Sequence, residues 1–145
     1  MTDIKIKLLC PNASPPAYAT AGSAGMDLSA AVEAPLTIPA GEWRLVPCGV
    51  AVQIPPGFGG FVFARSGLAV KKGITLCNGV GVIDNDYTGE IKIAVINLSD
   101  QDYTINPGDR IAQLVILPVE TADFVVVDDL STTRRGSKGF GSTGK

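Results

Sequence analysis

The residues best suited to chemistry are three carboxylates and a tyrosine within one short stretch, residues 78–93. The carboxylates are Asp84, Asp86 and Glu90, and Tyr87 lies among them. A carboxylate is ionised at neutral pH and can accept a proton from water, as a general base must. Three glycines in the same stretch let a ligand approach the backbone closely, because glycine has no Cβ. We predict that this stretch forms a pocket for a small polar ring, with Asp84 as the catalytic base.

The pattern around these residues is that of a β-hairpin. An apolar run enters at residues 80–83, turn-forming residues cluster at 84–89, and residues 91–93 alternate between apolar and polar. Two such runs on either side of a turn favour a pair of antiparallel strands. We therefore expect residues 78–93 to form one hairpin whose backbone lines the pocket.

The composition excludes several kinds of catalytic site. The chain of 145 residues has no histidine, which removes histidine-based triads, general bases and metal ligands. Its three cysteines, Cys10, Cys48 and Cys77, are widely spaced and form no CxxC motif. Neither a zinc site nor a disulfide framework is therefore expected. Each cysteine is expected to be a small buried apolar residue.

Charge and hydropathy indicate a single soluble domain. The net charge of −2 provides no overall attraction to nucleic acid or to an anionic membrane. The sequence shows neither a leader segment nor an apolar run of about 18 residues. We expect a protein of a reducing cytoplasm, with no direct nucleic-acid binding and no membrane partner.

Short apolar runs separated by proline and glycine predict an all-β protein. They recur at a spacing of about 8–12 residues, which is typical of β-sandwiches and jelly rolls. One short helix is expected, with Ser66 as its N-cap and Gly73 as its C-terminal stop. The expected strands are residues 4–9, 36–38, 44–54, 58–64, 93–98, 110–117 and 124–127.

The start of that helix is a second candidate ligand site. Arg65, Ser66 and Gly67 place a guanidinium, a hydroxyl and free backbone N–H groups at one point, which suits phosphate oxygens. The alternative is an ordinary capped helix with a surface arginine. Asp27 is the single charge in a run of small residues, and it is either functional or the cap of a structural turn. Gln113 lies in an apolar strand, so it needs polar partners at a sheet edge or on a ligand.

Residues 131–145 form a basic, glycine-rich tail. They hold four of the chain's 12 basic residues and no acidic one, so residues 1–130 carry 8 basic and 14 acidic side chains. Phe140 is the tail's sole large apolar residue, so the tail cannot bury enough surface to order itself. It is either a disordered tail or an arm that orders on an anionic ligand, with Arg135 on phosphates and Phe140 stacked on a ring. We expect a β-domain over 1–130 and a flexible arm over 131–145.

Five short segments, residues 21–30, 64–69, 78–90, 110–114 and 135–144, occur in the order and spacing of a known family. The chain resembles the homotrimeric dUTP pyrophosphatases (dUTPases). Each motif alone is modest, but five in order over nearly the whole chain are a strong signal. One departure is Thr88, where a longer polar or basic residue is frequent. The resemblance implies a jelly-roll-like (β-clip) sandwich that assembles as a homotrimer with sites at the subunit interfaces.

The resemblance also implies roles for single residues. Asp84 would orient and deprotonate the attacking water, Tyr87 would pack under deoxyribose, and Asp27 would hold Mg²⁺ through water; Asp86 is left as a surface carboxylate. The residues implied to contact uracil or sugar are Asn78, Val82, Ile83 and Lys92. Those implied to contact phosphate are Arg65, Ser66, Gly67 and Gln113, and an arm from another subunit would supply Arg135, Phe140, Gly141 and Ser142.

The implied activity is Mg²⁺-dependent hydrolysis of dUTP to dUMP and pyrophosphate, which keeps uracil out of DNA and supplies dUMP for thymidylate synthesis. Water would attack the α-phosphorus, with catalysis arising mostly from positioning and electrostatics. Two alternatives stay open: a dCTP deaminase-like enzyme, and a non-catalytic interaction protein with the same trimer surface. Ammonia release from dCTP would identify the first. The intact tail argues against the second, because a pure binding protein has no need of Arg135 and Phe140.

Overall fold

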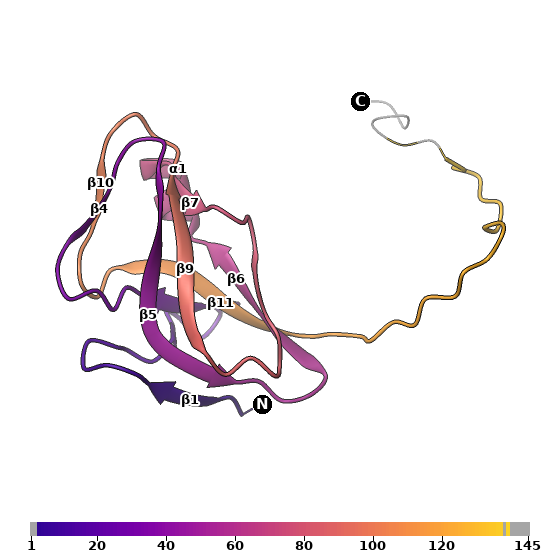
Figure 1. Cartoon of the computed structure of the whole chain (residues 1–145), viewed down its shortest axis with the longest axis horizontal. Coiled ribbons are helices and arrows are strands. Elements are labelled where there is room, and N and C mark those ends of the chain that lie inside the picture. The colour runs from indigo at the N-terminus through magenta and orange to yellow at the C-terminus, as the bar shows by residue number, and fades with distance from the viewer. Residues whose placement is uncertain (1–2, 138, 140–145) are drawn as a thin grey trace.

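The chain folds into short strands and one short helix, which a computed structural model describes for residues 3–137 and 139 (Figure 1). Proline and glycine lie in many of the turns between the strands, as the sequence pattern predicts. The elements in chain order are β1 (Lys5–Leu8), β2 (Ala17–Tyr18), β3 (Met26–Ser29), β4 (Leu36–Ile38), β5 (Trp43–Gln53), β6 (Phe58–Ala64), α1 (Ser66–Lys72), β7 (Ile74–Leu76), β8 (Gly81–Ile83), β9 (Glu90–Asn97), β10 (Tyr103–Ile105) and β11 (Arg110–Pro118).

These strands form two main sheets, here called sheet A and sheet B. Sheet A is four-stranded, in the order β1-β5-β9-β7, and sheet B is five-stranded, in the order β2-β3-β11-β6-β8. A separate two-stranded ribbon joins β10 to β4. Every strand pairing among the described residues is antiparallel. The predicted all-β sandwich with one short helix is confirmed.

The core lies between the two sheets. In β9, Ile91, Ile93 and Val95 are buried while Lys92 is exposed, as the alternation of side chains along a strand requires. Sheet B contributes buried residues to the same cluster, including Leu114 of β11. Each buried Val, Leu or Ile side chain contributes about 1.5–3 kcal/mol. This packing holds the two sheets against each other and so fixes the segments that connect them.

Helix α1 follows β6 directly and differs from its prediction at one end. Its N-cap is Arg65 rather than Ser66, in extended conformation and without a side-chain capping bond. Ser66 is the first helical residue, so its hydroxyl stays available to a ligand. The predicted stop at Gly73 is confirmed, because Gly73 adopts the left-handed conformation (φ 67°) and donates its N–H to the carbonyl of Ala69.

The predicted hairpin over residues 78–93 is wrong in its pairing. Its first arm, β8, pairs with β6 in sheet B, whereas its second arm, β9, pairs with β5 and β7 in sheet A. Residues 78–93 therefore form an arch that crosses from one sheet to the other. Alternation of side chains predicts which residues face the core, but it does not predict which strand an edge pairs with.

The predicted strand over residues 124–127 is also absent. Residues 119–137 run away from the body as a long extended segment (Figure 1), and Phe124 is 96% exposed. A strand needs a partner edge, and none of the strands in the described part of the chain pairs with this segment. Among the described residues, none covers the apolar side chains of this segment, and Phe124, Val125, Val126 and Leu130 are each at least 81% exposed.

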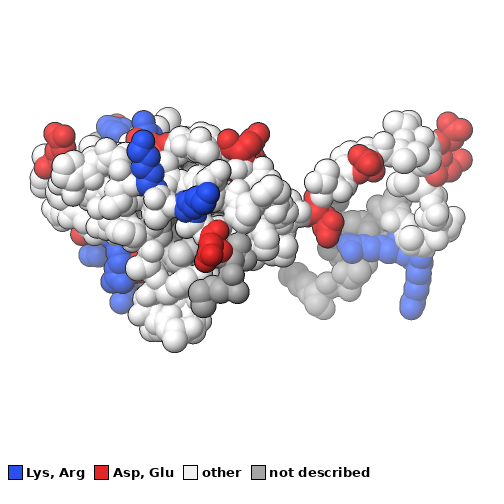
Figure 2. Space-filling model, turned by 90° about the horizontal axis from the view of Figure 1, so that it is seen from below, with Lys and Arg blue, Asp and Glu red and all other residues white. Residues whose placement is uncertain are grey.

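Cysteine burial and surface character complete the description of the fold. All three cysteines are free; Cys48 is buried as expected and Cys10 is half-buried, but Cys77 is exposed at the end of β7, so its expected burial is wrong. On the face shown in Figure 2, basic and acidic side chains are interspersed over the body. Residues 3–137 and 139 include no helix with the length and apolar character needed to cross a lipid bilayer.

Candidate functional site

The arch encloses a cavity of about 440 Å³ between the edges of the two sheets. Its floor is apolar, with Val62 from β6 and Leu76 from β7, and its walls come from the arch itself. The described residues that line it are Leu45, Val62, Leu76, Asn78, Val82, Ile83, Asp84, Tyr87, Glu90, Ile91, Lys92, Ile93 and Ala94. We call this the arch pocket.

Backbone groups on two strand edges border the arch pocket. Among the described residues, β8 is the last strand of sheet B and pairs only with β6, so its other edge has no partner strand. In β9, the ladder with β7 covers residues 95–97, and the N–H of Cys77 donates to the carbonyl of Ala94. Residues 90–93 have no partner strand on that side within the part of the chain that the structure describes. Backbone donors and acceptors therefore remain available to a planar polar ligand in the pocket.

Asp84 and Tyr87 lie in the turn of the arch, next to this cavity. Asp84 follows buried Ile83 and is exposed, and its carbonyl accepts a 3.1 Å hydrogen bond from the N–H of Tyr87. The Tyr87 hydroxyl donates to the carbonyl of Glu90 at 2.9 Å. A Cβ on residue 89 would lie 2.6 Å from that hydroxyl oxygen, so Gly89 is required for the ring to lie where it does. The tyrosine ring is thus held against the backbone of the turn.

A second cavity of about 440 Å³ lies between β3, the end of β11 and α1. Its lining is small or polar and carries two basic residues, Arg65 and Lys71, against one acidic residue, Asp27. The described residues that line it are Ala19, Ser23, Ala24, Gly25, Asp27, Arg65, Ser66, Gly67, Leu68, Lys71 and Gln113. We call this the helix pocket, and its excess of positive charge suits an anion.

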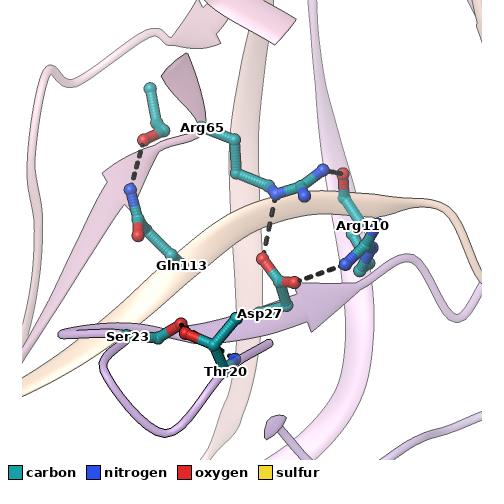
Figure 3. Close-up of polar contacts among 7 residues, drawn as sticks. Thr20, Ser23, Asp27, Arg65, Arg110 and Gln113 are labelled. Atoms are coloured by element: carbon teal, nitrogen blue, oxygen red, sulfur yellow. Dashed lines mark hydrogen bonds and ion pairs between the residues drawn. The ribbon is translucent and has the colours of Figure 1, made fainter. Parts of the chain in front are cut away.

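Asp27 joins two arginines at the helix pocket (Figure 3). Its Oδ1 lies 2.9 Å from Nε of Arg65, and its Oδ2 lies 2.9 Å from Nη1 of Arg110. Arg65 also donates from Nη1 to the carbonyl of Arg110 at 2.9 Å. The Asp27 side chain is only 16% exposed, so solvent screens these pairs less than it screens surface pairs. The guanidinium of Arg65 is therefore held in one orientation, with Nη2 uncommitted to these partners.

Gln113 has the polar partner that its place in an apolar strand requires. It lies opposite Asp27 of β3 and Phe63 of β6, in the middle of sheet B. Its Nε2 donates to the carbonyl of Ala64 at 2.9 Å. A Cβ on residue 25 would lie 2.8 Å from Oε1 of Gln113, so a glycine is needed at that position. The amide is thereby fixed at the edge of the helix pocket.

The structure divides the predicted site residues between the two pockets. The arch pocket receives Asn78, Val82, Ile83, Asp84, Tyr87 and Lys92. The helix pocket receives Asp27, Arg65, Ser66, Gly67 and Gln113. Arg135 is described and exposed on the extended segment, while Phe140, Gly141 and Ser142 lie outside the described residues. The two pockets share no lining residue.

Three residues at these pockets were missed by the sequence reasoning. Arg110 reaches Asp27 only because β11 and β3 are neighbours in sheet B. Lys71 lies four residues after Gly67, so it returns to the same face of the helix, which is a signal that the sequence did contain. Glu90 was noted as a carboxylate but given no role, and it lines the arch pocket.

The residues around Asp27 fit a metal only through water. Both of its oxygens already accept hydrogen bonds from guanidinium groups, whose positive charge disfavours direct coordination of a cation. A carboxylate oxygen has further lone-pair capacity, so it can still accept from a metal-bound water. The described residues hold no group of three histidine, cysteine or acidic side chains placed to bind a metal ion. A metal here would have to arrive with a ligand that supplies its own oxygens.

Comparison with known proteins decides the family. The family model described as dUTPase matches residues 12–144. The chain belongs to the dUTPase family. A deoxyuridine 5'-triphosphate nucleotidohydrolase of Desulfitobacterium hafniense is 54% identical over 130 residues, covering 89% of this chain and 86% of that one. A relative of the same description from Janthinobacterium sp. is 48% identical over 148 residues and covers 100% and 99% of the two chains.

Solved structures of dUTPases have the same architecture. The Staphylococcus bacteriophage 80alpha dUTPase with dUPNHPP superposes with a TM-score of 0.92, at 30% identity and full coverage of both chains. A mutant dUTPase of phage phi11 of S. aureus, with a structural Mg(II) ion, has a TM-score of 0.82 at 26% identity, covering 90% of this chain and 100% of that one. The resemblance to dUTPases predicted from the five motifs is thereby confirmed.

Proposed function

We propose that this chain hydrolyses dUTP to dUMP and pyrophosphate, binding uracil in the arch pocket and the triphosphate in a helix pocket. The observation that carries the proposal is the pair of unpaired strand edges facing one cavity, with Asp84 beside it. Membership of the dUTPase family and the named relatives support the same activity. The two arms of the arch, β8 and β9, lie in different sheets, which leaves space between them for a base. If they were paired with each other as a hairpin, that space would be closed.

Uracil recognition would rest mainly on the backbone. The edge of Val82 and Ile83 faces residues 90–93, with Asn78 and Lys92 at the ends of the pocket. A base with the wrong arrangement of donors and acceptors, such as cytosine, leaves a buried group unpaired at a cost of about 1–3 kcal/mol. Thymine must be excluded by shape, which requires rigid walls. The ladders of β8 with β6 and of β9 with β5 supply that rigidity.

Asp84 would act as the general base. It would take a proton from the attacking water, whose oxygen forms a bond to the α-phosphorus as the bond to the bridging oxygen breaks. Pyrophosphate leaves with the electron pair of the broken bond. Arg65, Ser66, Gln113 and Arg135 would stabilise the growing negative charge, and Tyr87 would contact the deoxyribose.

Mg²⁺ is the cofactor we propose. Asp27 would hold it through one of its waters, the mode that the surrounding arginines favour. When bound with the triphosphate, the ion would neutralise part of the negative charge of the phosphate groups. The structural Mg(II) ion in the phage phi11 relative supports a metal in this family.

A homotrimer would complete each site. Because the two pockets share no lining residue, an arch pocket of one copy can be used together with the helix pocket of another. The exposed apolar side chains of residues 119–130 would find their partners on a neighbouring copy. Residues 1–130 would be the nucleotide-binding domain, and residues 131–145 the arm that closes over the substrate with Arg135, Phe140, Gly141 and Ser142. Removing residues 131–145 should then abolish hydrolysis and leave the particle assembled.

The proposed role is to keep uracil out of DNA and to supply dUMP for thymidylate synthesis, in the cytoplasm. The interspersed charges in Figure 2 support the absence of direct nucleic-acid binding on that face. The decisive experiment is pyrophosphate release from dUTP, dTTP, dCTP and UTP, with and without Mg²⁺. We expect release from dUTP alone and only with Mg²⁺. Ammonia release from dCTP would support the deaminase-like alternative, and no turnover of any nucleotide would support a binding protein.

A further inference from the structure

An irregularity in β5 lies directly beside the arch. Pro47 is opposite Lys92 and Ala51 is opposite Glu90, so residues 48–50 of β5 stand against Ile91 alone. Gly49, in the middle of this bulge, has a φ of +65°, and a Cβ there would lie 2.8 Å from both Ala13 Cβ and Cys10 Sγ. The bulge is therefore packed in place by the N-terminal segment.

Glu90 is bound to this bulge through its side chain. Its Oε1 accepts a 3.1 Å hydrogen bond from the N–H of Gly49, a group that the displaced register separates from the β9 ladder. Its Oε2 lies 3.4 Å from Nζ of Lys92. The Glu90 side chain is 25% exposed, which is low for a carboxylate beside a pocket. Its position is thus set by the sheet rather than by solvent.

The backbone of Glu90 is bound to Tyr87. The tyrosine hydroxyl donates to the Glu90 carbonyl at 2.9 Å, across Gly89, whose missing side chain leaves room for the ring. Glu90 therefore connects two features: the bulge of β5 through its carboxylate, and the Tyr87 ring through its carbonyl. No other contact among the described residues orients the Tyr87 hydroxyl.

We propose that Glu90 is a positioning residue that sets the orientation of Tyr87 and thereby the discrimination against ribonucleotides. The inference rests on the proposed function, in which Tyr87 contacts the deoxyribose. A ring packed against the sugar in this way would leave no room for the 2′-hydroxyl of a ribonucleotide. A loosened Tyr87 ring would admit that hydroxyl. Glu90 belongs to the 90–93 edge of the arch pocket, but the walls that exclude the thymine methyl are held by the backbone ladders of β8 with β6 and of β9 with β5. A change of the Glu90 side chain leaves these ladders paired, so discrimination against the thymine methyl should not depend on that side chain.

The test compares kcat/KM of the full chain for dUTP, UTP and dTTP in Glu90→Ala and Glu90→Gln. In Glu90→Ala we expect the dUTP/UTP ratio to fall about tenfold, the value of one lost hydrogen bond, while the dUTP/dTTP ratio stays the same. In Glu90→Gln the side-chain amide oxygen can still accept from Gly49, so the dUTP/UTP ratio should stay within about twofold of the parent. A loss of stability alone would lower kcat/KM for all three substrates by the same factor. Glu42→Gln is the matched control, because Glu42 pairs with Arg44 and lines neither pocket.

Tyr87→Phe tests the same contact without altering the bulge. It removes the hydroxyl that donates to Glu90, so it should lower the dUTP/UTP ratio about as much as Glu90→Ala. If Glu90→Ala does not fold, an unchanged ratio in Tyr87→Phe still overturns the inference, because the hydroxyl bond to the Glu90 carbonyl is the step by which Glu90 would act on the ring. An unchanged dUTP/UTP ratio in folded Glu90→Ala or in Tyr87→Phe, or an equal loss in Glu90→Gln and Glu90→Ala, overturns the inference. Failure of the parent chain to release pyrophosphate from dUTP would instead overturn the proposed function.

Discussion

The carboxylate of Asp27 lies 2.9 Å from Nε of Arg65. Its second oxygen contacts Arg110, so one half-buried carboxylate orients two guanidinium groups at the helix pocket (Figure 3). This relationship gives Asp27 a function that does not require a metal. It also explains why a pocket that we propose to bind a triphosphate contains an acidic residue: the carboxylate reduces repulsion between the arginines and fixes the direction of Arg65.

Asp27→Asn should raise the KM for dUTP about tenfold and lower kcat less. An asparagine can accept from one arginine but presents its NH₂ to the other, so Arg65 loses its fixed orientation. Arg110→Gln is the informative companion, because it removes one ion pair and leaves Arg65 bound to Asp27. It should raise KM by a smaller factor. If Asp27 acted only through a metal-bound water, Arg110→Gln would leave the KM for dUTP unchanged. Added Mg²⁺ would then restore the KM of Asp27→Asn toward the parent value.

Asp84→Asn should fold, bind dUTP and lose nearly all turnover. The amide keeps the shape of the side chain but cannot accept the proton of the attacking water. Asp86→Asn is a matched control two residues away, since Asp86 is exposed and lines neither pocket. Single-turnover pyrophosphate release and binding of dUPNHPP would separate chemistry from affinity. Turnover near the parent value in Asp84→Asn would mean that the base is another group.

Lys71→Gln should weaken binding of the triphosphate, whereas Lys72→Gln should not. Lys71 lines the helix pocket and makes no ion pair among the described residues, whereas Lys72 lines a neighbouring surface hollow, which Lys71 also borders, but not the helix pocket. Removing one positive charge beside a phosphate should cost about tenfold in affinity for dUPNHPP, and less at higher salt. Affinity for dUMP, which lacks the outer phosphates, should change little. An equal loss of affinity for dUPNHPP in Lys71→Gln and Lys72→Gln would show that binding depends on the net charge of the protein and not on the position of Lys71.

Stability should fall at alkaline pH because of Cys48. Burial, and then the nearby Glu90 charge, raise the pKa of the Cys48 thiol from 9.0 to about 12. Below pH 9 the thiol is protonated in both the folded and the unfolded chain, so it causes no pH dependence. Between pH 9 and 12 the unfolded chain releases the proton and the folded chain keeps it. The free energy of unfolding therefore falls, by about 1.4 kcal/mol for each tenfold difference in ionisation.

Chemical denaturation from pH 7 to 11 would measure this effect in the parent, Cys48→Ala and Cys77→Ala. Cys48→Ala should show a shallower decline, while Cys77→Ala, which alters an exposed thiol, should keep the slope of the parent. Burial and Asp109 also raise the pKa of the Tyr103 phenol, so part of the decline will remain in both variants. Identical slopes in all three proteins would exclude the assignment to Cys48.

Local sequence patterns determined the fold class, most strand positions and the candidate residues. The strand β6 and the stop of α1 at Gly73 lie where alternation and turn residues predicted them, because both depend on near neighbours in the chain. The family resemblance named most of the candidate site residues without revealing that they lie in two separate pockets. Residue types and their spacing along the chain are enough to identify the candidate residues, since each motif is a short continuous segment.

Tertiary structure decided which edges meet and which charges touch. Only the sandwich reveals that β8 and β9 pair into different sheets, so the predicted hairpin is an open arch. Asp27 and Arg110 are 83 residues apart and become partners only because β3 and β11 pair in sheet B. Residues 124–127 have strand-like composition but gain no partner strand within the described part of the chain. The physical reason is common to all three: a strand edge or a charge is satisfied by whatever the fold brings beside it, and that neighbour is not encoded in the segment itself.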